Sequence, residues 1–131
     1  MSRHTLAMGI AAFGLVDGLI HGYLVLSVFH GHFLGNLLPT LFVLDFIGWI
    51  ALIAAFLLSL ASYRWLHPVI DLTMALYAAV EIVVWISKGG PDPLGLGYLA
   101  KGVEAVLIVG LLVHALSAGP RESAQTISAA R

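Results

Sequence analysis

The sequence predicts an all-α membrane protein: an up-down-up-down bundle of four transmembrane helices with both termini cytoplasmic. Two observations carry this fold class. The 131 residues are 60% hydrophobic and only 10% charged, whereas soluble domains carry about 25% charged residues. In addition, four segments reach the roughly 20 mostly apolar residues that a helix needs to cross a bilayer. These segments are 5–29, 38–60, 68–87 and 96–116.

Residues that favour turns or helix starts separate the four segments. The loop 30–36 is glycine-rich and precedes Pro39, a good first-turn residue. The turn 62–67 precedes Pro68, and the Gly/Pro-rich run 88–93 separates the third segment from the fourth. Short connections make neighbouring helices antiparallel. We therefore expect one transmembrane domain at 1–118 and a polar, disordered tail at 119–131.

The first apolar segment follows a short polar start, as a secretory signal does. It is longer than the usual core of about 7–15 residues, contains Asp17 and His21, and lacks a convincing small-residue cleavage site. We interpret it as a retained transmembrane helix.

The Lys and Arg residues predict the orientation. Arg3, Arg64 and the tail arginines fall on one side, whereas Lys88 falls on the other, with Lys101 just inside the membrane. Because Lys and Arg accumulate in cytoplasmic segments, both termini are expected to face the cytoplasm.

The composition excludes several classes of function. The chain has no cysteine, which excludes disulfides, thiolate nucleophiles and cysteine-ligated iron–sulfur clusters. Its formal net charge is -1, so it has no basic field with which to bind nucleic acid.

Ionisable residues inside the predicted helices are the main functional signal, because a charge at the bilayer centre costs at least about 2.5–3.5 kcal/mol. With a helical rise of about 1.5 Å per residue, six of these ionisable residues lie between the bilayer midplane and a level roughly 9 Å further outward. We expect one polar pocket in the outer leaflet half, formed by Asp17, His21, Asp45, Glu81, Lys101 and Glu104.

Three states would relieve the excess negative charge of this pocket. Some carboxylates could hold protons, a polar or cationic substrate could bind, or a metal cation could bind to Asp17, His21, Asp45, Glu81 and Glu104. A di-metal site is disfavoured, because no Glu-x-x-His pair is present and Lys101 competes for the carboxylates. In a purely structural alternative, Lys101 neutralises Glu104 or Glu81, His21 pairs with Asp17, and the cluster only sets helix register.

The remaining polar residues are weaker candidates. Asp71 is expected to reach the membrane interface or Arg64, and His67 to lie in the turn. His30 and His32 are expected to be solvated, with a surface metal site or pH sensing as the alternative. His114 points about 80° away from Glu104 and is not expected to join the pocket.

A b-type haem would need two axial histidines at one height on facing helices. Only His67 with His114 is geometrically conceivable, so neither haem nor an iron–sulfur cluster is expected. Trp49 is interpreted as a core or lipid-facing residue. Gly14, Gly18 and Gly22 follow the small-xxx-small spacing that lets another helix approach closely.

Four stretches resemble a family of small, uncharacterised four-helix integral membrane proteins of archaea and some bacteria. The stretches are 18–21, 42–48, 79–85 and 99–108. The resemblance implies the four-helix fold and no mechanism. We expect the chain in the plasma (cytoplasmic) membrane of a prokaryote.

Three functions from different classes are compatible with the sequence. The first is a protein whose pocket handles a proton, a cation or a small polar ligand. The second is an accessory subunit of a larger membrane complex, since the chain has little mass outside the bilayer. The third is a membrane enzyme that uses a protonated carboxylic acid on a lipid-soluble substrate. A homo-oligomer or a larger membrane complex is the expected assembly, and an isolated homo-oligomer would argue against the accessory role.

Overall fold

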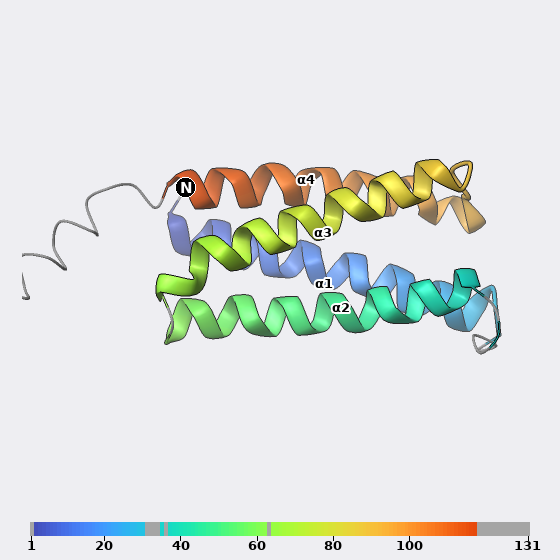
Figure 1. Ribbon diagram of the computed structural model, residues 1–131, viewed down its shortest axis with the longest axis horizontal. Helices are drawn as coiled ribbons and strands as arrows, with labels where there is room; N and C mark the ends of the chain where they lie inside the picture. Colours follow the sequence, from blue (N-terminus) through green and yellow to red (C-terminus); the bar gives the residue numbers. More distant parts are fainter. Residues whose placement is uncertain (1, 31–34, 36, 63, 118–131) are drawn as a thin grey trace, which may run out of the picture.

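A computed structural model describes residues 2–30, 35, 37–62 and 64–117, which form a bundle of four long helices (Figure 1). The helices are α1 (Arg3–Ser27), α2 (Leu37–Ala61), α3 (His67–Ser87) and α4 (Leu96–Leu116). Short 3-10 turns, Arg64–Leu66 and Pro93–Gly95, precede α3 and α4. The predicted all-α four-helix bundle is confirmed, and the predicted helix ends agree within two residues. His32 and the predicted tail at 119–131 lie outside the described residues.

All four helices are long and apolar enough to cross a membrane, by length and composition. Many of their large apolar side chains point outward, among them Leu26, Leu58 and Leu116. This arrangement suits a lipid environment, where a helix satisfies its own backbone hydrogen bonds and apolar side chains can face acyl chains.

Successive helices run in opposite directions along the bundle (Figure 1). One end therefore holds the α1–α2 and α3–α4 connections, and the other end holds the α2–α3 connection. An apolar core between them buries Trp49, Phe56, Met74, Leu107 and Leu111.

The predicted glycine stripe of α1 packs against α2 within the same chain. A Cβ atom added to Gly18 would lie 3.1 Å from the Cβ atom of Trp49, and one added to Gly22 would lie 3.2 Å from the ring of Phe46. The absence of side chains on α1 thus allows the close approach of α2, which brings residues of both helices into the polar region described next.

Candidate functional site

The six predicted residues lie toward the end of the bundle that holds the α1–α2 and α3–α4 connections. We call this group the polar cluster: Asp17, His21, Asp45, Glu81, Lys101 and Glu104. Asp17 and Glu104 are completely buried, His21 and Asp45 are buried, and Glu81 and Lys101 are partly buried. Every helix contributes one carboxylate, so the cluster is a product of the whole bundle.

His21 connects α1 to α2. Its Nδ1 atom lies 2.8 Å from Asp45 Oδ2 and 3.6 Å from Asp17 Oδ2, and it is also 3.0 Å from the backbone oxygen of Asp17. The nearest carboxylate therefore belongs to the neighbouring helix, whereas the structural alternative assumed pairing with Asp17 within α1. The reason is the close α1–α2 packing, which sequence spacing does not reveal.

Asp17 belongs to two groups of residues that could hold a metal ion. Asp17, His21 and Asp45 each offer one ligand atom, and these atoms lie within 4.8 Å of one another. Asp17, Glu81 and Glu104 form a second group of the same size. Both carboxylate oxygens of Asp17 are buried and accept no hydrogen bond from the described residues.

Lys101 pairs with Glu104, one turn away in α4, as the structural alternative expected. This ion pair neutralises one of the four carboxylates, and a protonated His21 would neutralise a second. If all four carboxylates are ionised, two negative charges then remain in a region of low dielectric, where unpaired charges are strongly unfavourable. Without bound protons or a bound cation, the polar cluster therefore keeps an excess of negative charge.

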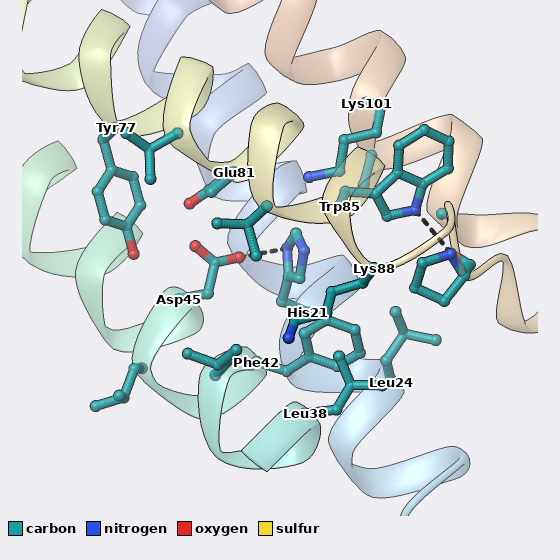
Figure 2. A pocket seen from close by; sticks show the side chains of 17 residues that line it. His21, Leu24, Leu38, Phe42, Asp45, Tyr77, Glu81, Trp85, Lys88 and Lys101 are labelled. Atoms are coloured by element: carbon teal, nitrogen blue, oxygen red, sulfur yellow. Dashed lines mark hydrogen bonds and ion pairs between the residues drawn. The ribbon is translucent and has the colours of Figure 1, made fainter.

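Two aromatic residues adjoin the cluster: Trp49, which lies in the core as one of its two predicted places, and Tyr77, for which no role was predicted. The Trp49 Nε1–H donates a hydrogen bond to Glu81 Oε2 at 3.2 Å. Tyr77 packs edge-on against Trp49 at 5.5 Å, and its hydroxyl points toward Asp45 (Figure 2). Trp49 follows Asp45 by four residues and Tyr77 precedes Glu81 by four. Residues four apart share one face of a helix, so this spacing could have indicated that both aromatic residues lie near the cluster.

A cavity of about 210 Å³ lies beside the polar cluster, mainly between α2 and α3 (Figure 2). His21, Asp45, Glu81, Lys88 and Lys101 line it together with mainly apolar residues of all four helices. Three lining residues, Leu44, Val80 and Val84, are also exposed on the outside of the bundle. The cavity thus reaches the apolar outer surface, and it is somewhat larger than an apolar cavity of about 150 Å³ that holds benzene.

Two residues outside the polar cluster lie elsewhere than predicted. Asp71 is buried against His114 and does not reach the interface. His67 is the buried first residue of α3 and does not belong to an exposed turn. The rings of His67 and His114 are in T-shaped contact with centroids 4.8 Å apart, so no porphyrin fits between them in this arrangement. As predicted from helical phase, His114 does not join the polar cluster.

Comparison with known protein families, with curated proteins and with solved structures found no match for this chain.

Proposed function

We propose that the chain is an integral membrane protein whose polar cluster and adjoining cavity bind a small cationic ligand, with a metal cation or protons as competing occupants. The observation that carries this proposal is the meeting of four carboxylates, one from each helix, whose ion pairs among the described residues are those with Lys101 and His21. A bound positive charge would relieve the repulsion among the carboxylates.

The cavity supports a ligand with both charged and apolar parts. Its walls are mainly leucine, valine and aromatic side chains, and the carboxylates of Asp45 and Glu81 lie close together along it (Figure 2). Ligand sites in proteins commonly combine apolar walls with a few polar groups that fix orientation. A small organic ammonium ion would place its charge near Asp45 and Glu81 and its carbon atoms against the walls.

We further propose that both termini face the cytoplasm, in the plasma membrane of a prokaryote, so that the cavity lies in the outer half of the bilayer. The distribution of Lys and Arg supports this orientation. Since the chain has no cysteine, single substitutions can report the topology. Cysteines at Ser2 and Ser117 should react with an impermeant maleimide only after the cells are opened, whereas one at Ser87 should react on intact cells.

A binding experiment tests the occupant. The metal-stripped protein in detergent is mixed with tetramethylammonium, Na⁺ or Mg²⁺, while binding heat and proton release are recorded. At least one cation should bind to the wild type and displace protons, and D45N and E81Q should weaken that binding at least tenfold. Glu122→Gln, which removes a carboxylate outside the described helices, is the matched control. The proposal fails if no cation binds and D45N and E81Q exchange as many protons as the wild type.

An enzyme acting on a lipid-soluble substrate is the second candidate, because the cavity reaches the apolar outer surface of the bundle between α2 and α3. A protonated Glu81 or Asp45 would then serve as proton donor. Lipid extracted with the purified protein and identified by mass spectrometry tests this candidate, and a stoichiometric lipid lost in E81Q would favour it over a cation site.

An accessory role in a larger complex receives less support from the packing. Gly14, Gly18 and Gly22 face α2 of the same chain, so this stripe is not available to a partner helix. Purification in a mild detergent distinguishes the cases, since an accessory subunit should retain stoichiometric partners.

A further inference from the structure

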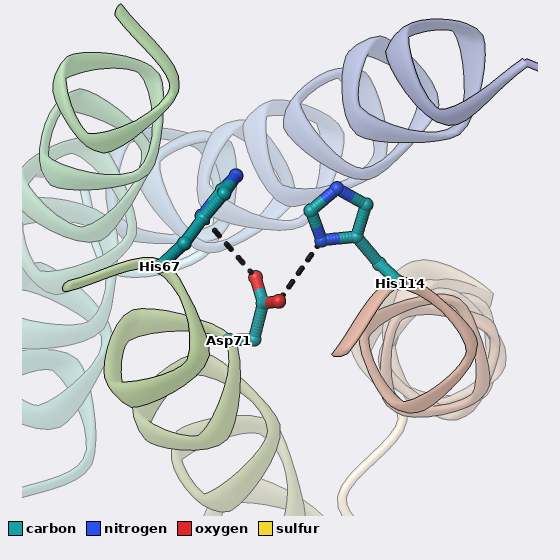
Figure 3. Close-up of side chains that lie close together, drawn as sticks. All are labelled: His67, Asp71 and His114. Atoms are coloured by element: carbon teal, nitrogen blue, oxygen red, sulfur yellow. Dashed lines mark hydrogen bonds and ion pairs between the residues drawn. The ribbon is translucent and has the colours of Figure 1, made fainter. Parts of the chain in front are cut away.

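A second buried polar group lies at the opposite end of the bundle from the polar cluster. We call it the imidazole site: His67 and Asp71 of α3 with His114 of α4 (Figure 3). The three residues are 5%, 1% and 0% exposed. His67 and Asp71 are four residues apart and share one face of α3, and the packing of α4 on α3 brings His114 to the same face.

The Asp71 carboxylate lies between the two imidazole rings. Its Oδ2 atom is 2.9 Å from His114 Nδ1, and its Oδ1 atom is 3.9 Å from His67 Nδ1. Figure 3 shows both rings turned toward this carboxylate. Each of the three residues offers one ligand atom, and these atoms lie within 4.8 Å of one another.

Atoms within this site are buried without hydrogen-bond partners. His114 Nε2 and Asp71 Oδ1 make no hydrogen bond to any described residue. Leaving a buried polar atom unpaired costs about 1–3 kcal/mol, so native proteins rarely keep such atoms without a reason. His67, by contrast, is positioned by Ser59, whose hydroxyl lies 3.0 Å from His67 Nδ1 and donates to the backbone oxygen of Phe56.

We propose that His67, Asp71 and His114 bind a divalent transition-metal ion, with Zn²⁺ as the best suited. Two imidazoles and one carboxylate favour zinc and its neighbours over Mg²⁺ and Ca²⁺, which prefer oxygen ligands. Zinc also accepts irregular geometry, and three protein ligands leave its fourth position open. Ser59 is a positioning residue, since partners that orient a ligating histidine raise metal affinity.

A crevice at the same end of the bundle adjoins one residue of this site, His67. This crevice of about 500 Å³ runs between the first turns of α1 and the last turns of α2, and His67 forms part of its wall together with Arg3, His4, Met8, Leu57, Leu60 and Ala61.

Cobalt provides the direct test, because four-coordinate Co²⁺ is coloured whereas Zn²⁺ is silent. The full-length protein is treated with EDTA in detergent, titrated with Co²⁺ and then with Zn²⁺. The wild type should bind one Co²⁺ per chain with strong visible absorption, and Zn²⁺ should displace it. H114A and D71N should weaken Co²⁺ binding at least tenfold, while His30→Ala, which removes an exposed histidine, should not change it.

Other outcomes would overturn the proposal, and they are distinct from failure of the polar cluster as a cation site. A wild type without visible Co²⁺ absorption would overturn it directly. A signal lost in H21A but kept in H114A would assign the metal to the polar cluster. Because removing a buried side chain can disrupt the fold, helix content by circular dichroism accompanies each variant. If H114A does not fold, the test uses D71N, which keeps the side-chain volume. Zn²⁺ should then raise the Tm of the wild type and leave the Tm of D71N unchanged.

Discussion

The imidazole of His21 in α1 lies 2.8 Å from the carboxylate of Asp45 in α2, and both side chains are buried. This pair joins the first two helices at the level of the polar cluster. It adds to the contact that sequence spacing predicts within α1, where His21 Nδ1 lies 3.6 Å from Asp17 Oδ2.

A double-mutant cycle should reveal the coupling between these two residues. His21→Leu leaves Asp45 without its imidazole, and Asp45→Leu leaves His21 without its carboxylate, so each single variant should lose stability. The double variant should lose less than the sum, with a coupling free energy of about 1–3 kcal/mol. Reversible unfolding in mixed detergent micelles measures each free energy of unfolding. Additive effects of the two substitutions would contradict the pairing.

Replacing Trp49 by Phe should destabilise the bundle through Glu81. The substitution removes the Nε1–H that donates to Glu81 Oε2, and hydrogen bonds to charged groups contribute about 1.5–3 kcal/mol. Thermal unfolding should show this loss. Trp65→Phe is the control, because Trp65 is 76% exposed and exposed substitutions usually change stability by about 0.5 kcal/mol or less. Equal effects of the two variants would show that the Trp49 hydrogen bond contributes nothing.

Gly48→Ala should alter the cavity by displacing Tyr77. A Cβ atom at residue 48 would overlap the Tyr77 hydroxyl, which would have to move away from its place near Asp45. We expect at least a tenfold loss of whichever cation the wild type binds at the polar cluster, with helix content retained.

Gly102→Ala is the matched control for this glycine, since it lies in α4 with nothing within 4 Å of its added Cβ. It should leave cation binding unchanged and should raise stability by up to about 1 kcal/mol, as expected for Gly to Ala in a helix. If Gly48→Ala and Gly102→Ala bound the cation equally well, the proposed role of Gly48 in shaping the cavity would be refuted.

Asp92→Ala should loosen the start of α4. Asp92 Oδ1 accepts hydrogen bonds from the backbone amides of Gly97 at 2.8 Å and Tyr98 at 3.2 Å. Loss of such a cap costs about 1 kcal/mol, and hydrogen exchange at Gly97 and Tyr98 should become faster. Asp92→Asn keeps an accepting oxygen and should show a smaller effect. Unchanged exchange in Asp92→Ala would mean that the carboxylate does not stabilise this helix end.

Much of the polar cluster could be anticipated because a transmembrane helix has a fixed rise per residue. Counting from the helix midpoints placed Asp17, Asp45, Glu81 and Glu104 near one level, and the structure brings their helices together at that end of the bundle. Counting could not identify partners, because rotation about each helix axis depends on packing. Trp49 illustrates this limit, since its hydrogen bond with Glu81 spans α2 and α3.

The imidazole site shows the limit more clearly. His67 and Asp71 are spaced for one helix face, but His67 adjoins the turn before α3, where solvent exposure is the ordinary expectation. His114 lies 43 residues from Asp71, and no local pattern relates them. Only the packing of α2, α3 and α4 against one another buries all three residues together.

The sequence by itself determined that this chain forms four apolar helices, because such segments satisfy their backbone hydrogen bonds internally and suit a lipid environment. Tertiary structure decided which buried charges meet, which face of each helix is turned inward, and that polar groups gather at two ends separated by an apolar core. The physical reason is that hydropathy depends on composition along one segment, whereas side-chain pairing depends on how four segments rotate and pack against one another.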